Sequence, residues 1–227
     1  MIPLWLACDA PPPIDEGVDF RDGLSEGEGM SGERGNIKIS EVLWSGAVKG
    51  DVWVADDVFV ELRNEGVRPI DLSQWRLTLT GPIEETWVLP DLGRLINVGE
   101  HVAYAAKNTG CLPLATVVSG LRLPMDAGFA LTLRDRDERL LETIGDVDQL
   151  PFAGGYDGAL SRSMERSELM FGSDGGNPAA WHFMTGAEVD VPNDDLVHVD
   201  CRATTRATPG RPNSPDYAGA FAAGSLE

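Results

Sequence analysis

Short runs in which apolar and polar side chains are interleaved recur along this chain from Ile37 to about Asn213. The first two lie at residues 37–42 and 58–62. Because successive side chains of a β-strand point to opposite faces, this pattern predicts strands with one face on a core and the other in water. We therefore expect the polar side chains of both runs to face solvent.

Further runs of this kind predict an all-β protein. Turn-forming residues at 63–66 and 126–128 separate some of them. Residues 129–133 and 140–144, joined by the polar residues 135–138, predict a β-hairpin. The expected strands are residues 37–43, 52–54, 58–62, 101–105, 129–133 and 140–144.

Two more alternating runs, residues 187–191 and 196–201, flank the turn sequence Pro192-Asn193-Asp194-Asp195. They predict an added hairpin that projects from one end of the domain. Additional loops on a rigid scaffold often carry binding function, so this hairpin is the leading expected interaction surface. A structural hairpin that covers a sheet edge remains the alternative.

Cys111 and Cys201 predict a disulfide, because a pair of cysteines in an exported protein tends to oxidise. The alternative is two buried thiols that never meet. Neither these cysteines nor the three histidines of the chain show the ligand spacing of a zinc site.

The charge balance limits the class of partner. The 227 residues include 37 Asp and Glu against 18 Lys and Arg, a formal net charge of −19. A chain this acidic repels nucleic-acid phosphates unless a basic patch overrides the field, and its arginines are interleaved with acidic residues. We expect no nucleic-acid partner; cations or basic partners fit the sign better.

The sequence also predicts a protein that is not an enzyme. It has no Gly-x-Ser-x-Gly nucleophile turn, no phosphate-binding glycine loop and no His-Glu-x-x-His zinc helix. His101, His182 and His198 each fall in or beside an expected strand, where a core or rim histidine is the simplest interpretation. No cofactor is expected.

Calcium is the one metal that the composition favours, because calcium binds hard oxygen ligands. Two acidic loops supply such ligands, although neither has the spacing of a helix-loop-helix calcium site. Solvated turns are the simpler interpretation. The weak candidates are Asp135, Asp137 and Glu138 in one loop, and Asp190, Asp194 and Asp195 in the other.

The first 36 residues have a different composition from the rest. Residues 4–10, Leu-Trp-Leu-Ala-Cys-Asp-Ala, resemble the end of a bacterial lipoprotein signal peptide, which predicts lipidation of Cys8 and makes residues 1–8 a signal remnant. The alternative is a plain surface cysteine. Residues 9–36 are acidic and poor in apolar side chains, typical of a disordered tether, and residues 215–227 of a flexible tail.

Several motifs in a fixed order give the chain a resemblance to the lamin tail domain family. They are Asp71-Leu72-Ser73-Gln74-Trp75, Asn97-Val98-Gly99-Glu100, Ser163-Met164-Glu165-Arg166, Asn177-Pro178-Ala179-Ala180-Trp181 and the closing Ala207-Thr208-Pro209-Gly210-Arg211-Pro212-Asn213. The family usually has glycine where this chain has Gln74, and often has glycine in the connection at 135–138. The resemblance implies an immunoglobulin-like β-sandwich over residues 37–214.

The same resemblance implies an exported protein of the bacterial cell envelope, in the periplasm or on the cell surface. The expected function is a noncatalytic binding or structural module whose partner is an envelope protein or polysaccharide, with the membrane reached only through the lipid anchor. Two alternatives are a calcium-dependent adhesion module and an accessory domain of a secreted nuclease or phosphatase system.

Overall fold

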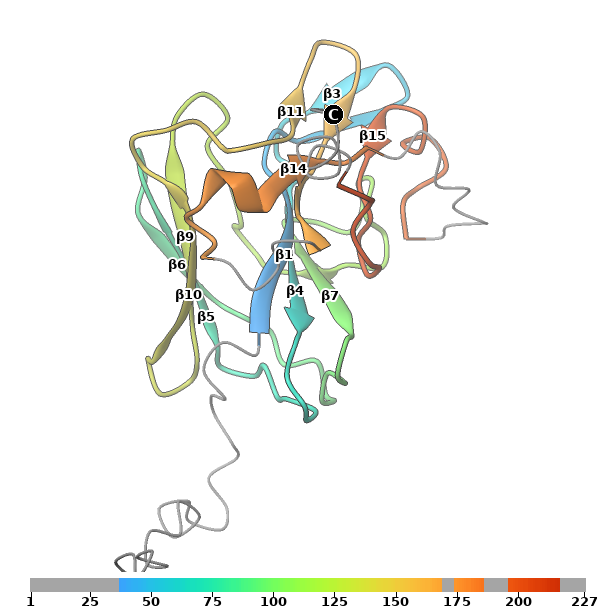
Figure 1. Cartoon of the computed structure of the whole chain (residues 1–227). Coiled ribbons are helices and arrows are strands. Elements are labelled where there is room, and N and C mark those ends of the chain that lie inside the picture. The colour runs from blue at the N-terminus through green and yellow to red at the C-terminus, as the bar shows by residue number, and fades with distance from the viewer. Residues whose placement is uncertain (1–36, 169–173, 186–195, 217–227) are drawn as a thin grey trace, which may run out of the picture.

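The computed structural model describes residues 37–168, 174–185 and 196–216 (Figure 1). These residues contain many short strands and no α-helix. Two larger sheets pack face to face, and two small sheets lie at one end of the molecule. The all-β expectation is therefore confirmed, with the layers of a β-sandwich.

The larger sheet has six strands in the order β14-β13-β1-β4-β7-β8. Its pairings are antiparallel except for β7 with β8. The strands are β1 (Ile37–Leu43), β4 (Phe59–Asn64), β7 (His101–Ala105), β8 (Thr116–Val117), β13 (Met164–Arg166) and β14 (Trp181–Phe183).

The facing sheet has four antiparallel strands in the order β10-β9-β5-β6. The predicted hairpin forms its β9 and β10, and Glu138 in the connection takes the left-handed conformation with φ 61°. The strands are β5 (Arg76–Thr80), β6 (Glu85–Val88), β9 (Phe129–Arg134) and β10 (Leu140–Asp146).

Two small sheets complete the fold. One pairs two strands as a hairpin, and the other has the order β11-β12-β15, with β12 and β15 parallel. A short 3-10 helix, Pro178–Ala180, precedes β14. The strands are β2 (Ala47–Lys49), β3 (Val52–Val54), β11 (Gly155–Tyr156), β12 (Ser161–Arg162) and β15 (Thr205–Arg206).

The main hydrophobic core lies between the two larger sheets and includes Trp75, which is 1% exposed. In β9 buried and partly exposed residues alternate, so the outer face of the four-stranded sheet meets solvent as expected. Other core residues are Ile39, Leu62, Leu77, Leu79, Ile96, Tyr104, Leu131, Leu133 and Ile144.

The six-stranded sheet is buried on both faces, which corrects the first expectation from the sequence. Strands β1, β4 and β7 are almost continuously buried, and Ser40, Glu41 and Glu61 are 0% exposed rather than solvated. A second apolar cluster covers part of the outer face. Its residues are Leu43, Ala47, Phe59, Ala105, Cys111, Leu112, Val197, Cys201 and Ala207.

The expected hairpin at 187–201 is wrong in its second half. Residues 196–201 form turns instead of a strand, and Val197 and Cys201 are buried in the second cluster. The residues 187–195 lie outside the described part of the chain. The apolar residues of 196–201 pack against the outer face of the sheet from a turn. Alternation of apolar and polar residues does not by itself distinguish such a turn from a strand.

The remaining strand boundaries follow the prediction in part. Residues 37–43, 52–54 and 101–105 form strands as expected. Residues 73–74 form a turn that leads to the buried Trp75, and β5 begins at Arg76, while Ile70 makes an isolated bridge with Ile96. Contacts also continue past residue 214, because Thr185 Oγ1 donates to the Pro215 carbonyl at 2.8 Å.

Candidate functional site

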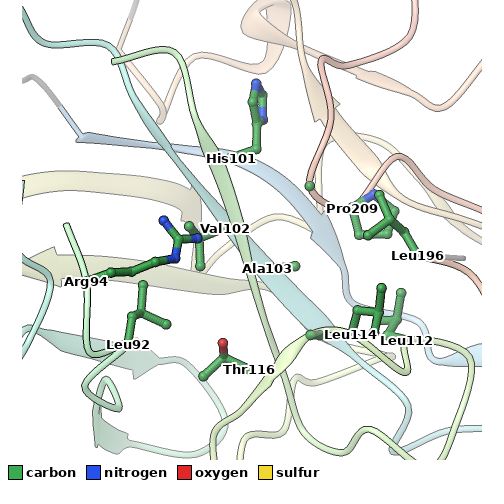
Figure 2. Close-up of a pocket in the computed structure, with 12 residues that line it drawn as sticks. Leu92, Arg94, His101, Val102, Ala103, Leu112, Leu114, Thr116, Leu196 and Pro209 are labelled. Atoms are coloured by element: carbon green, nitrogen blue, oxygen red, sulfur yellow. The ribbon is translucent and has the colours of Figure 1, made fainter. Parts of the chain in front are cut away.

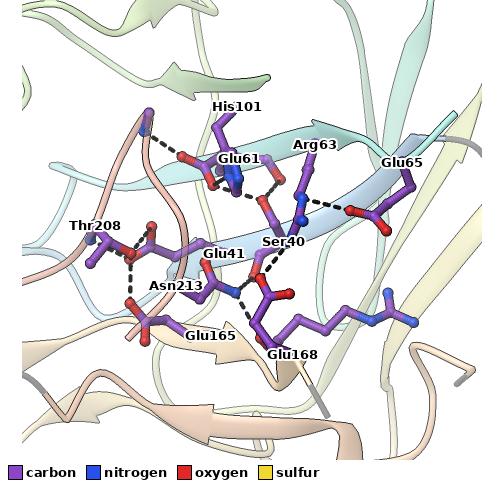
Figure 3. Close-up of polar contacts among 12 residues, drawn as sticks. Ser40, Glu41, Glu61, Arg63, Glu65, His101, Glu165, Glu168, Thr208 and Asn213 are labelled. Atoms are coloured by element: carbon purple, nitrogen blue, oxygen red, sulfur yellow. Dashed lines mark hydrogen bonds and ion pairs between the residues drawn. The ribbon is translucent and has the colours of Figure 1, made fainter. Parts of the chain in front are cut away.

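Three glutamates lie side by side on the outer face of the six-stranded sheet (Figure 3). Glu41 of β1 is paired in register with Glu61 of β4 on one side and with Glu165 of β13 on the other. All three are 0% exposed. Like charges opposite each other in a sheet are destabilising, so these side chains need compensating donors.

The closing segment, residues 207–214, supplies most of those donors. The Thr208 backbone N–H donates to Glu41 Oε1 at 2.8 Å, and the Thr208 hydroxyl donates to Glu165 Oε1 at 2.7 Å and to Glu41 Oε2 at 3.2 Å. The Gly210 N–H donates to Glu61 Oε2. The Ser214 N–H donates to Glu165 Oε2 at 3.0 Å.

Glu61 has two further neighbours. Its Oε1 accepts a hydrogen bond from Ser40 Oγ at 2.7 Å and lies 2.7 Å from His101 Nδ1. All six carboxylate oxygens of the three glutamates therefore have partners from the chain itself. The cluster holds the closing segment on the sheet and leaves no oxygen free for a substrate.

Asn213 binds the end of the closing segment to the sheet through two hydrogen bonds (Figure 3). Its Nδ2 donates to the backbone carbonyls of Ser40 at 2.9 Å and Arg166 at 2.8 Å, bridging β1 and β13. A single amide thus satisfies two carbonyls on neighbouring strands. This explains why a segment with few strand hydrogen bonds of its own has a defined position.

Two glutamates of the cluster have raised pKa values. Burial raises the pKa of Glu41 well above its usual range, and the charges of Glu165 and Glu61 raise it further. Burial also raises the pKa of Glu165, against the opposing effect of the Ser214 and Thr208 hydroxyl donors. His182 Nδ1 lies 4.0 Å from Glu165 Oε2.

A buried ion pair joins the two sheets beneath this cluster. Arg166 of β13 is fully buried and contacts Glu142 Oε1 of β10 through Nη1. Glu142 Oε2 accepts the Ile39 backbone N–H at 2.6 Å, next to the register shift in β1. The Arg166 guanidinium also lies 5.6 Å from the centre of the Trp181 ring.

A pocket of about 370 Å³ opens beside the cluster (Figure 2). Arg94 and His101 give it a polar side, and Thr116 adds a hydroxyl. Arg94 is itself paired with Glu100 at 2.6 Å, and His101 with Glu61. The apolar lining comes from Leu92, Val102, Ala103, Leu112, Leu114, Ala115, Leu196 and Pro209.

In the loop expected to offer calcium ligands, the acidic side chains form ion pairs with arginines. Asp135 is buried, and its Oδ1 accepts the N–H groups of Asp137 and Arg139, both at 2.9 Å. Arg139 contacts Asp135 Oδ2 at 2.8 Å and Asp137 Oδ2 at 2.7 Å, and Glu138 pairs with Arg76. Within residues 37–168, 174–185 and 196–216, no group of three His, Cys, Asp or Glu residues could hold a metal ion.

Some expected site residues lie beyond the described chain, among them Cys8 and the second calcium set, Asp190, Asp194 and Asp195. The Cys111–Cys201 disulfide is confirmed, with the Cα atoms 5.7 Å apart. Among the residues that the structure describes, no helix is long and apolar enough to cross a membrane.

The histidines take three different positions. His101 and His182 are buried in strands, in contact with Glu61 and near Glu165, respectively. His198 lies in a turn rather than beside a strand, and its Nδ1 is 3.6 Å from Asp200 Oδ2. Sequence reasoning missed the glutamate cluster, since its period-two pattern placed these polar residues in water and nothing local shows what covers them.

No model of a known protein family matches the chain, and no curated protein matches it. We therefore infer the function from the residues and contacts of the chain itself.

Proposed function

We propose that this chain is a noncatalytic binding or structural module of a bacterial cell envelope, built on a lamin-tail-type, immunoglobulin-like sandwich and tethered through a lipidated Cys8. The observation that carries the noncatalytic part is the glutamate cluster. Its six carboxylate oxygens are all used to hold the closing segment, so these buried acids build a scaffold instead of facing a substrate.

Two motif positions support the lamin-tail type. Gln74 has φ 66°, a conformation that glycine adopts most easily, at the position where the family usually has glycine. The turn that it forms delivers Trp75 into the core. Asn177 caps the short helix that leads to the buried Trp181, as its side chain accepts the Ala179 N–H at 3.1 Å.

The closing motif gives a third reason. Its threonine, glycine and asparagine each have a defined partner on the sheet: Glu41 and Glu165 for Thr208, Glu61 for Gly210, and two backbone carbonyls for Asn213. The disulfide fixes the preceding turn, residues 196–201, on the same face. A scaffold held in this way suits a module that presents fixed loops to a partner.

Fractionation of cells that express the full-length protein tests the anchor. Replacing Cys8 with serine removes the only sulfur that a lipid could modify near the amino terminus, so the Cys8→Ser protein should leave the membrane fraction and appear in the soluble fraction. Ala10→Ser, two residues away, is the matched control and should stay with the membrane. Equal membrane association of Cys8→Ser and the parent protein would refute the lipid anchor.

A further inference from the structure

A second hollow, of about 440 Å³, is lined by residues of β11, β12 and β14 and of the loops beside them. This volume is within the range of about 300–1,000 Å³ that is typical of small-ligand sites. Segments far apart in the sequence form it. Its lining residues are Trp44, Gly154, Gly155, Tyr156, Asp157, Arg162 and Phe183.

Three of the lining residues are aromatic, so we call this site the aromatic hollow. Tyr156 stacks on Trp53, with ring centres 5.2 Å apart and planes 4° apart. Trp53 and Tyr156 are each 38% exposed, and Phe183 is 52% exposed. Gly155 has φ 123°, and a Cβ atom there would lie 3.3 Å from Trp44 Cζ2, so any side chain at this position would crowd the Trp44 ring.

The polar atoms of these rings are already used inside the protein. Trp44 Nε1 donates to the Ala153 carbonyl at 2.8 Å, and Trp53 Nε1 donates to the Ser45 carbonyl at 3.0 Å. Tyr156 Oη donates to the Gly158 carbonyl at 2.8 Å. These bonds fix the rings, so a ligand meets ring faces in set positions and little conformational entropy is lost on binding.

One acid and one base stand beside the rings. Asp157 is exposed, and its Oδ1 accepts the N–H groups of Leu160 at 2.8 Å and Ala159 at 2.9 Å; these two bonds lower its pKa. The Arg162 guanidinium lies 5.7 Å from the centre of the Phe183 ring and donates to the Met184 carbonyl at 3.1 Å. The lining of the hollow therefore combines fixed acceptors and donors with no net charge.

We propose that the aromatic hollow binds a neutral saccharide, as a short stretch of an envelope polysaccharide. One face of a pyranose ring presents C–H groups, whose slight positive charge suits the negative face of an aromatic ring. Hydroxyl groups around the sugar both donate and accept, so they can bond to Asp157 and Arg162 together. This inference rests on the proposed binding function and names its ligand class.

Two other ligand classes fit the aromatic hollow less well. A quaternary ammonium group also binds aromatic faces, but the Arg162 guanidinium already lies against the Phe183 ring, so this ring offers a second cation less contact. Nucleic-acid bases stack on aromatic rings as well, yet the phosphates would meet a protein of net charge −19. A neutral sugar meets neither penalty.

Affinity electrophoresis of the full chain tests the proposal, with native gels that contain hydroxyethylcellulose, glucomannan or xylan. We expect at least one of them to retard the protein. Titration of the matching oligosaccharide should then change tryptophan fluorescence. Tyr156→Ala and Phe183→Ala should each weaken binding about tenfold or more, as loss of an aromatic anchor does.

The control variant Leu114→Ala removes an exposed side chain from the other pocket and should bind sugars like the parent protein. Melting temperatures check that each variant is folded. No retardation by any polysaccharide, binding of phosphocholine instead, or sugar binding that survives Tyr156→Ala and Phe183→Ala would overturn the saccharide site. These results are separate from the fractionation of Cys8→Ser, so either proposal can fail alone.

Discussion

At the scale of single residues, the unusual feature is a row of three carboxylates inside the protein. Glu41 stands between Glu61 and Glu165, and all three are buried. Burial and the two neighbouring charges raise the pKa of Glu41 well above its usual range. Hydrogen bonds from the Ser163 hydroxyl and the Thr208 N–H offset only part of this effect, so the charged form of Glu41 is costly in the folded state.

The sign of the resulting pH dependence follows from linkage. Because the pKa of Glu41 is higher in the folded than in the unfolded chain, the folded state binds more protons between the two values. The stabilising contribution is complete below the ordinary glutamate pKa and is lost as the pH rises through the folded value. The raised pKa of Glu165 acts in the same direction.

We predict that Glu41→Gln makes the free energy of unfolding less dependent on pH. The amide keeps the shape of the side chain and can still accept the Thr208 N–H, but it cannot lose a proton. Urea unfolding at several pH values between about 5 and 8 measures the slope. Glu84→Gln changes an exposed glutamate and is the matched control. A Glu41→Gln slope equal to that of the parent protein would contradict the raised pKa.

At the scale of elements, the closing segment packs on the outer face of the six-stranded sheet. Residues 207–214 contain no strand, so side-chain acceptors on β1, β4 and β13 take the place of a regular ladder. Thr208 is central because its backbone and hydroxyl together serve two glutamates. An unsatisfied buried acceptor costs about 1–3 kcal/mol, more when it is charged.

Thr208→Val should therefore lower the free energy of unfolding by about 1–3 kcal/mol. Valine has nearly the same shape but leaves Glu165 Oε1 and Glu41 Oε2 without the hydroxyl donor. Chemical denaturation gives the value. Thr86→Val, which removes an exposed hydroxyl that pairs with Thr78, serves as the control and should change stability by about 0.5 kcal/mol or less. Equal changes in the free energy of unfolding for the two variants would mean that the Thr208 hydroxyl does not stabilise the closing segment on the sheet.

At the scale of the whole molecule, one covalent bond joins two segments on the outer face of the six-stranded sheet. Cys111 and Cys201 are 90 residues apart in the sequence and lie in the second apolar cluster. Their bond connects the segment after β7 to the turns that precede β15. The disulfide therefore holds residues 196–201 on this face, and the glutamate cluster holds the closing segment beside them.

Reduction of this disulfide should destabilise the protein by about 3–5 kcal/mol, because the unfolded chain gains the entropy of an open loop. A lower melting temperature in the presence of a reducing agent would show the effect, and the double variant Cys111→Ala, Cys201→Ala should not respond to the reductant. Thiol labelling of the unfolded, unreduced protein should reach neither cysteine. Labelling of both would contradict the bond.

The sequence by itself determined the all-β class, the strands β1 and β7, the hairpin of β9 and β10, and the cysteine pair. Strand periodicity and turn residues act over a few neighbouring positions, so they are visible in the sequence without knowledge of the fold.

Only the tertiary structure decided which polar residues are buried. Glu41 accepts its hydrogen bonds from a residue 167 positions later, and no local pattern records that such a contact exists. For the same reason residues 196–201 became a packed turn instead of a strand, and Trp44, Tyr156, Arg162 and Phe183 gathered in one hollow. Long-range contacts set these outcomes, because the environment of a side chain depends on segments that are distant along the chain.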